Sequence, residues 1–546
     1  MEDIPLRTYC MIFGYDGTGY HGMQIQMRNN KKVDEIETIE GEIESCFEKL
    51  NIFYVNEDIN KCKSRRSKIG ERNVTEDNFL KKIRWSRVGR TDKGVHSVCQ
   101  VVSFRAKIRI NNELSSIIDK KNKDERTREL VDNLLMERNI LNKKTDIDVN
   151  IGDRENPNFG VNEDNLSGNG NKTRKIKNNP LLPFINDSLK SDNVESNTSP
   201  SEEFINELII LNYIVEKMNE LLDSRINVFK IIRVTKNFDA RTDCSRRQYE
   251  YIMPEYLLYP VELTDLELKK ELENVCELRY KQELIEVNNN KRRKREESNG
   301  TSNNVEDKSE NIKIFEFHQL NRQNNYGFGN DKKLVNFANT QGRDSFLNNL
   351  LKHKIDNNKL KEFQSILDEY TGTHSFHNFT SKSSYYDSNS WRHIDDIKAE
   401  FIDISDNECV NKINTIRVII RGQSFMLHQI RKMIALAIEV FRGTAPKNAI
   451  KLSFLPNKLF IHLSPSQGLL LDRVSYRTYN IKRSISTEKK DFNVHSISFD
   501  NNECQFVKKM ERFKRDFIYK RIYETITKQC SLIKKDDARE EYDNNK

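Results

Sequence analysis

One aspartate in this chain is placed where a carboxylate could do chemistry on a polyanionic substrate. Asp92 follows Arg90 closely and precedes Lys93 and Gly94. An Asp just before a Gly is typical of a turn, because Gly adopts positive φ and the Asp side chain bonds its own backbone. Basic residues crowd the same stretch: Arg84, Arg87, Arg90 and Lys93. A carboxylate in these surroundings is a candidate nucleophile, and a plain surface turn is the alternative interpretation.

The strand predicted after this turn has a basic face. Apolar and polar residues alternate from Val101 to Ile110, as in a half-buried strand. The apolar face holds Val102, Phe104, Ala106, Ile108 and Ile110, and the polar face holds Ser103, Arg105, Lys107 and Arg109. Cationic side chains in a row suit the phosphates of RNA, so we expect this face to lie beside Asp92. An ordinary solvated sheet face is the alternative.

The residues after Phe425 predict an amphipathic helix with a charge on its apolar face. Arg431 falls in register with Leu427, Ile434 and Ile438, at the spacing of one helix face. His428, Lys432, Ala435 and Glu439 share a more polar face. A buried guanidinium needs a carboxylate partner, because an unpaired buried charge is strongly destabilising. Arg431 could also reach solvent or pair with a purely structural acid.

Composition limits the possible functions. The 546 residues suggest about two to four domains, and the net charge of +8 is modest, so local clusters must carry any affinity for a polyanion. The nine cysteines form no CxxC pair, which argues against a zinc module or a disulfide framework. No third metal-ligand motif accompanies His374 and His377. Gly17–Gly22 fits G-x-G-x-x-G, but no helix is expected before Thr38, so dinucleotide binding is not predicted.

Changes in composition divide the chain into four parts. Residues 1–258 form the N-terminal half of a core, with an Asn-, Lys- and Ser-rich insertion at about 111–204 that we expect to be largely disordered and dispensable for stability. Residues 259–345 form a low-complexity basic linker. Its run Lys291–Arg295 fits a nuclear import signal or a plain basic patch. Residues 346–480 form the C-terminal half, and residues 481–546 an extension with a helix at Gln505–Gln529 that packs on the core, lies along RNA, or does both.

Several motifs, in order, resemble the TruA family of tRNA pseudouridine synthases. The segment Gly89–His96 is similar to the family's GRTD-x-GVH signature. Met23 stands where bacterial members carry Trp, which is similar to the eukaryotic multi-site branch. Further similar motifs lie at 14–24, 238–241, 247–251, 372–381, 422–433 and 468–476. The resemblance covers about 7–110, 206–258 and 360–480.

The resemblance implies a fold and a set of site residues. The fold is α+β, with two ferredoxin-like (RRM-like) halves that form one bent, mixed or antiparallel sheet flanked by helices, and a basic cleft. Asp92 is implied as the nucleophile, Arg431 as the ion-pair partner that keeps it ionised, and Tyr249 as the ring that stacks on the target uracil. The residues expected to bind substrate are Arg90, Arg105, Lys107, Arg109, Arg247 and Leu469.

The resemblance also implies a reaction and a partner. The expected activity converts specific uridines of tRNA, at anticodon-stem positions, to pseudouridine, and mRNA or snRNA are further possible substrates. No cofactor, metal or membrane is expected, and the protein is expected to be monomeric and nuclear, with the mitochondrion or cytoplasm as alternatives. One rival is a non-catalytic RNA-binding protein of the same fold. A carboxylate-dependent glycosidase or nuclease would need a second acid near Asp92 or a metal cluster.

Overall fold

The structure is a computed structural model. It describes residues 3–28, 31–32, 36–55, 79–120, 128–137, 201–259, 354–381, 383–405, 412–485, 494–499 and 504–528. The proposed import signal at Lys291–Arg295 lies outside these residues, as do nearly all of the predicted linker and most of the predicted insertion. No helix in the described ranges is long and apolar enough to cross a bilayer.

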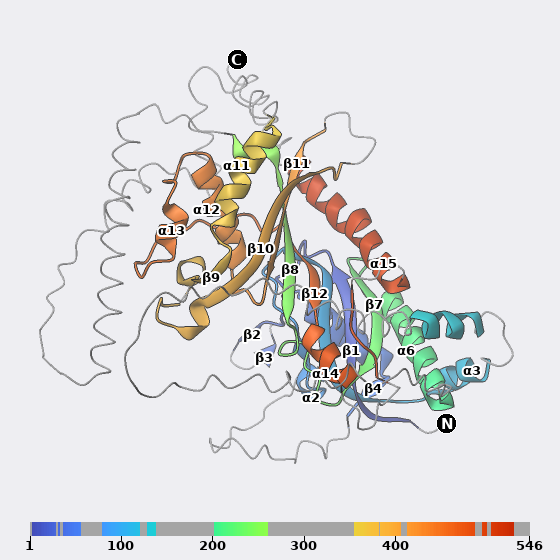
Figure 1. The fold of residues 1–546 in the computed structure, drawn as a ribbon. Coiled ribbons are helices and arrows are strands. Elements are labelled where there is room, and N and C mark those ends of the chain that lie inside the picture. The colour runs from blue at the N-terminus through green and yellow to red at the C-terminus, as the bar shows by residue number, and fades with distance from the viewer. Residues whose placement is uncertain are drawn as a thin grey trace, which may run out of the picture.

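A mixed sheet of ten strands forms the centre of the molecule (Figure 1). Its main path has the order β7-β1-β6-β12-β8-β11-β10-β9, and β4 and β5 also pair with β6. A mixed sheet flanked by helices is confirmed. The strands are β1 (Ile4–Tyr15), β4 (Phe53–Tyr54), β5 (Ser86–Arg87), β6 (His96–Ile108), β7 (Ile226–Val234), β8 (Arg246–Pro254), β9 (Gly372–Ser375), β10 (Trp391–Ile402), β11 (Thr415–Gly422) and β12 (Leu469–Ser475), with a separate hairpin of β2 (Met27–Arg28) and β3 (Lys31–Lys32).

Helices cover the sheet, and α1 (Ile39–Leu50) shows how the sequence specifies one of them. The helix begins after Thr38, as expected, and Thr38 is its N-cap, with the hydroxyl accepting the Gly41 N–H. Asn51 ends the helix in the left-handed conformation. The others are α2 (Phe79–Lys82), α3 (Asn112–Lys120), α6 (Glu202–Leu221), α11 (Asn357–Asp368), α12 (Gln429–Phe441), α13 (Ala449–Ser453), α14 (Arg477–Ile485) and α15 (Gln505–Phe513), with short helices η2 (Glu255–Leu258), η3 (His377–Phe379), η4 (Ser388–Ser390) and η5 (Lys514–Tyr519).

Two groups of helices lie at opposite ends of the sheet. Helices α11, α12 and α13 gather near β9 and β10, whereas α3 and α6 lie near β7 (Figure 1). At the second end α1, α6, β1 and β6 enclose an aromatic core, in which Phe104 contacts Phe47 and Phe53 with ring centroids 5.5 and 5.1 Å apart. The apolar residues predicted for the strand at 101–110 are those that the core buries, with Ile110 at its rim.

Strand β12 joins the two ends of the sheet. It runs antiparallel to β8, where Leu471 is opposite Tyr249. It also runs parallel to β6 over a short stretch, where Leu471 is opposite Ser97. Because β6 begins only a few residues after Asp92, this junction brings the loop that carries Asp92 to the strand that carries Tyr249.

The first part of the predicted insertion packs on the core. A helix at residues 128–137 ends at Glu137, which is 6% exposed. The Glu137 carboxylate binds the Lys230 ammonium of β7 and accepts the Phe506 N–H at the start of α15, 3.1 Å away. The helix at 128–137 thus contacts the core, and whether the whole insertion is dispensable for stability stays a prediction.

The C-terminal helix packs on the core as predicted. Phe506, Met510 and Phe513 are buried, but Phe517 is 52% exposed. The reason is η5, a π-helical turn at Lys514–Tyr519 that follows α15 directly and continues into helix at residues 520–528. A π turn holds one extra residue per turn, so Ile518 is buried here and Phe517 is not.

Candidate active site

The loop that carries Asp92 is fixed by close contact with the turn after β1. Gly17 and Gly22 belong to this turn, and a Cβ at Gly17 would lie 2.1 Å from the Val95 carbonyl oxygen. A Cβ at Gly22, where φ is +91°, would lie 2.7 Å from the Thr91 oxygen. Larger residues would push the loop away, so these glycines set the position of Asp92.

Side chains from β1 and β6 support the same loop from the sheet. The Tyr15 hydroxyl lies 2.8 Å from the Thr91 hydroxyl. The Gln100 amide donates to the Gly89 carbonyl at 3.1 Å. The loop is therefore held both from the turn and from the sheet, which leaves its one carboxylate in a defined place.

Asp92 faces two basic side chains of the α12 segment. Arg431 Nη1 lies 3.1 Å from Asp92 Oδ2, and the Asp92 and Arg431 side chains are 16% and 12% exposed. The Arg431 Nε donates to the Ser464 carbonyl at 2.8 Å, which fixes the plane of the guanidinium. His428 Nε2 lies 3.6 Å from the same carboxylate oxygen. The structure thus brings Asp92 and Arg431 together across 339 residues of sequence.

Tyr249 lies beside this carboxylate, on the face of β8 that points toward Phe425. The two rings are 5.2 Å apart, edge to face, and Tyr249 is 8% exposed. A Cβ on Gly89 would lie 3.7 Å from the Tyr249 hydroxyl, so the hydroxyl reaches the Asp92 loop. Burial raises the pKa of Tyr249 to about 12, and Asp92 contributes to the increase. The phenol therefore stays protonated at neutral pH.

Arg247 binds the backbone of three loops that surround the site. Its guanidinium donates to the carbonyls of Val88 at 2.9 Å, Gln423 at 2.7 Å and Arg241 at 3.2 Å. Only 9% of the residue is exposed. In this structure Arg247 connects the Asp92 loop to the segment before α12, and contact with a substrate stays a prediction.

Sequence comparisons agree with this arrangement. A family profile described as tRNA pseudouridine synthase matches residues 366–477, which include α12 and Arg431. The chain is 32% identical to tRNA pseudouridine synthase 1 of Candida albicans over 58% of this chain and 50% of the relative. It is 26% identical to tRNA pseudouridine synthase 1 of Kluyveromyces lactis over 95% of this chain and 67% of the relative.

Residues 366–477 thus match the family of tRNA pseudouridine synthases, and the curated relatives of the chain carry the same name. A third relative, tRNA pseudouridine synthase 1 of Candida glabrata, is 33% identical over 57% of this chain and 53% of its own length. The chain therefore spans about half to two thirds of the length of these curated relatives. All three come from yeasts, in line with the eukaryotic similarity of the motifs.

The predicted basic face lies farther from Asp92 than expected. Strand β6 begins at His96 and runs away from the loop, and a strand rises about 3.3 Å per residue, so Arg105 lies roughly 30 Å along it. Lys107 and Arg109 lie over the Tyr54 ring, with Nζ and Cζ 5.8 and 5.0 Å from its centroid. These three residues therefore lie at the far end of β6 from Asp92, and their contact with a substrate stays a prediction.

Two other predicted binding residues lie nearer to the site. Arg90 is exposed in the Asp92 loop, and partial burial together with Arg87 and Arg241 lowers its pKa. Arg87 itself is paired with the buried Glu40. Leu469 opens β12 opposite Tyr251 and is 6% exposed. Their contact with a substrate stays a prediction.

The helix that carries Arg431 begins later than predicted. Helix α12 starts at Gln429, so Leu427 precedes it and is 53% exposed, contrary to its expected place on the apolar face. Ile434 and Ile438 are buried as predicted. Lys432, expected near solvent, is half-buried: it donates to the Asn378 carbonyl at 3.2 Å, and burial lowers its pKa.

Sequence reasoning underestimated His428. It stands at the N-cap of α12 with φ of 67°, a left-handed conformation that is uncommon outside glycine. This backbone turn places the imidazole beside Asp92, whereas helical spacing had placed it with the polar residues of a regular helix. No spacing rule signals a left-handed residue at this point.

Proposed function

We propose that this protein isomerises uridine to pseudouridine in tRNA, with Asp92 as the nucleophile. The observation that carries the proposal is the meeting of Asp92, Arg431 and Tyr249 from three separate segments at one half-buried place. The names of the yeast relatives, tRNA pseudouridine synthase 1, support the same reaction and substrate.

The chemistry follows from the state of each side chain. A carboxylate attacks as the anion, and the Arg431 cation pairs with Asp92 at 3.1 Å and orients it. Asp92 either attacks ribose C1′ and forms a C–O bond, or takes the C2′ proton to give a glycal, and in both cases the N1–C1′ bond of uridine breaks. The released uracil turns and C1′ bonds to C5, while the Asp92–C1′ bond breaks or the proton returns to C2′. The C5 proton leaves to solvent, and N1 gains a proton. Nothing is oxidised or reduced, so this isomerisation needs no external reagent.

The target base must leave its stack, because its glycosidic bond is unreachable inside a helix. In our proposal the flipped uracil stacks on Tyr249, whose protonated phenol carries no charge that would repel the base. The two ends of the sheet act as two ferredoxin-like halves, and the RNA lies in a basic cleft between them. Arg90, Arg247 and Leu469 contact the nucleotide, and Arg105, Lys107 and Arg109 contact more distant phosphates.

The finer identity of the substrate is also part of the proposal. We place the modified uridines in the anticodon stem, with mRNA or snRNA as further substrates. The enzyme acts as a monomer in the nucleus, where the run Lys291–Arg295 serves for import. Loss of nuclear fluorescence from a tagged chain with these five residues changed to Gln would support that role, and an unchanged distribution would count against it.

The experiment that tests the reaction is tritium release from tRNA transcripts labelled at C5 of uridine. We expect release with the wild-type protein and a loss of at least a hundredfold with Asp92→Asn, about 2.7 kcal/mol of barrier. Asp403→Asn is the control, because Asp403 is an exposed carboxylate paired with Lys412. Tight tRNA binding without release from wild-type protein would instead make this a non-catalytic RNA-binding protein of the same fold.

A further inference from the structure

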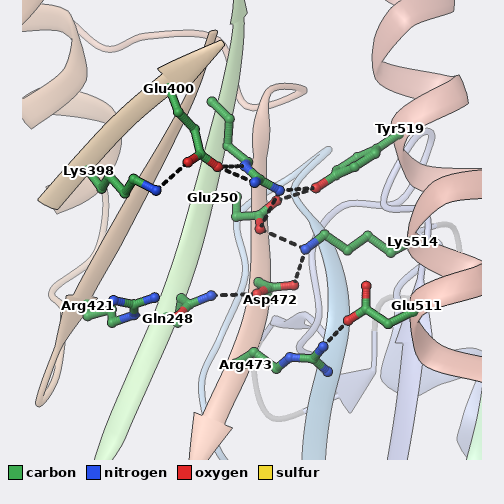
Figure 2. Close-up of polar contacts among 11 residues, drawn as sticks. Gln248, Glu250, Lys398, Glu400, Arg421, Asp472, Arg473, Glu511, Lys514 and Tyr519 are labelled. Carbon is green, nitrogen blue, oxygen red and sulfur yellow. Dashed lines mark hydrogen bonds and ion pairs between the residues drawn. The ribbon is translucent and has the colours of Figure 1, made fainter. Parts of the chain in front are cut away.

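The C-terminal helix places one buried cation between two strands of the sheet (Figure 2). Lys514 Nζ lies 2.7 Å from Glu250 Oε1 of β8 and 2.6 Å from Asp472 Oδ1 of β12. Lys514, Glu250 and Asp472 are only 6%, 2% and 2% exposed. Tyr519, from the same π turn, donates to Glu250 Oε2 at 2.7 Å.

The surrounding groups leave the two carboxylates dependent on Lys514. Burial alone would lower the pKa of Lys514, but Asp472 and Glu250 raise it above its ordinary value, so the ammonium stays charged. Gln248 donates to Asp472 Oδ2 at 2.7 Å, which adds no charge. Arg417 approaches Glu250 Oε1 only to 3.6 Å and is paired with Glu400. Without Lys514, the buried carboxylates of Glu250 and Asp472 would have only Arg417 as a nearby cation, together with neutral hydrogen-bond donors. Such poorly compensated buried charges are strongly destabilising.

The two carboxylates that Lys514 binds lie close to Tyr249 of the candidate active site. Glu250 is adjacent to Tyr249 in the sequence, and Asp472 is adjacent to the residue that pairs with Tyr249 in the sheet. Glu250 follows Tyr249 directly, and strand alternation points the two side chains to opposite faces of β8. Leu471, the residue before Asp472, is opposite both Tyr249 of β8 and Ser97 of β6. A register shift at Asp472 makes this part of β12 irregular, so backbone pairing alone holds it less firmly.

The same helix reaches the turn after β1, which contacts the Asp92 loop, by a second ion pair. Arg521 Nε lies 2.9 Å from Asp16 Oδ2, and His96 Nδ1 lies 3.0 Å from Asp16 Oδ1. Burial would raise the pKa of Asp16, but His96 and Thr18 hold it below its ordinary value. His96 opens β6 just after Asp92. Lys514 and Arg521 are seven residues apart, roughly 10 Å along the helix. Through these two side chains the helix contacts β8 and β12 at one point and, through Asp16 and His96, the start of β6 at another.

We propose that the helix at residues 505–528 is a brace for the active site, and that Lys514 and Arg521 are positioning residues of the reaction. This inference rests on the proposed function. Lys514 fixes β8 and β12 behind Tyr249, and Arg521 fixes the turn at Asp16 behind Asp92. Neither side chain contacts RNA. Because an error of about 1 Å at the reacting atoms can cost a hundredfold in rate, loss of the brace should slow chemistry without weakening tRNA binding.

The test compares full-length variants by single-turnover tritium release, tRNA affinity and thermal unfolding. For Lys514→Met we expect a rate loss of at least tenfold with tRNA Kd within twofold of wild type. Adding Glu250→Gln removes one buried anion and should recover part of the rate. Lys509→Met is the matched control, since Lys509 is exposed on the same helix, and its rate and Kd should equal those of wild type.

If Lys514→Met does not fold, Arg521→Met provides a second test of the proposal. We expect this variant to fold, because the Arg521 side chain is 39% exposed and its loss leaves Asp16 paired with His96. We expect a severalfold rate loss at unchanged Kd, together with faster hydrogen exchange of the amides at 93–97. Unchanged rate and exchange would overturn the brace. A loss confined to Kd, or a matching loss in Lys509→Met, would show that the helix binds RNA instead. Exchange can be measured even if wild-type protein releases no tritium, so failure of the reaction and of the brace are distinguishable.

Discussion

The His428 imidazole lies 3.6 Å from the Asp92 carboxylate because the His428 backbone is left-handed, with φ of 67°. Such a conformation costs a non-glycine residue roughly 1–2 kcal/mol. Strained backbone at a functional site persists when the surrounding structure holds it. The His428 backbone thus bears strain at the point where α12 delivers both of its basic side chains to Asp92.

The variant His428→Gly removes the imidazole beside Asp92 and also relieves the backbone strain at residue 428. Glycine adopts the left-handed conformation without strain, so the free energy of unfolding should stay within about 1 kcal/mol of wild type. The rate of tritium release should fall, by less than in Arg431→Met, because Asp92 loses one neighbour and keeps the closer one. His428→Ala retains the strained backbone and should be the less stable of the two. Equal stability of both variants in urea denaturation would contradict the strain.

A second prediction contrasts Arg431 with its neighbour Lys432. Arg431→Met removes the cation 3.1 Å from Asp92 and should reduce the single-turnover rate at least a hundredfold, because the carboxylate loses the partner that orients it. Lys432→Met should leave the rate near wild type. It loses the bond to the Asn378 carbonyl, so about 1 kcal/mol of stability should be lost instead. Comparable rate losses in the two variants would contradict the role of Arg431 as the ion-pair partner on which Asp92 depends.

Some of this site could be predicted from the sequence because short motifs specify local structure. Gly17 and Gly22 mark a turn that only glycine fits, and Thr38 marks a helix start. Arg431, in register with Ile434 and Ile438, indicated a guanidinium in need of an acid. The ion pair of Lys514 with Glu250 and Asp472 could not be predicted, because it joins three segments distant in sequence. Lys514 does follow Met510 by four residues, on the apolar side of the helix, and that was its only signal.

Stability should depend on pH through Glu439 of α12. Burial raises the pKa of Glu439 to about 7, and Arg442 offsets this only in part. Between about pH 4.5 and 7 the carboxyl of Glu439 keeps a proton in the folded protein that it releases in the unfolded chain. The contribution of Glu439 to stability is therefore greatest at low pH and decreases as pH rises, by up to about 3 kcal/mol. Glu439→Gln should remove this contribution and be the more stable protein at pH 8. Urea denaturation at pH 5 and pH 8 measures both effects.

The exposed Glu362 provides the control for Glu439. Its side chain is 52% exposed and paired with Lys359, so Glu362→Gln should keep the wild-type slope. His462, 4.0 Å from Glu439, also titrates, and burial lowers its pKa. The difference between wild type and Glu439→Gln isolates the carboxyl as long as His462 is present in both. A slope unchanged by Glu439→Gln would show that another group carries it.

Salt dependence can locate the RNA along β6. Removing one cation that binds a phosphate should reduce the slope of log affinity against log salt by about 0.7 to 0.9. Changing Arg105, Lys107 and Arg109 to Gln should lower the slope by about two to three times this amount only if the RNA reaches roughly 30 Å from His96. Lys93→Gln, beside Asp92, should lower it by the amount expected for a single cation. A slope altered by Lys93→Gln but not by the triple variant would confine the RNA to the Asp92 end.

Deletions should divide the insertion into two parts with different effects. Removing 138–198 takes out a stretch with little apolar content, and we expect the melting temperature to stay within about 2 °C, the shift from less than 1 kcal/mol. Removing 121–198 also takes out the helix at 128–137. Lys230 and the Phe506 N–H then both lose the Glu137 carboxylate as their partner. We expect the free energy of unfolding to decrease by about 1–3 kcal/mol. Glu137→Ala in the intact chain should reproduce most of that loss. If both deletions melt alike, Glu137 contributes nothing to the docking of α15.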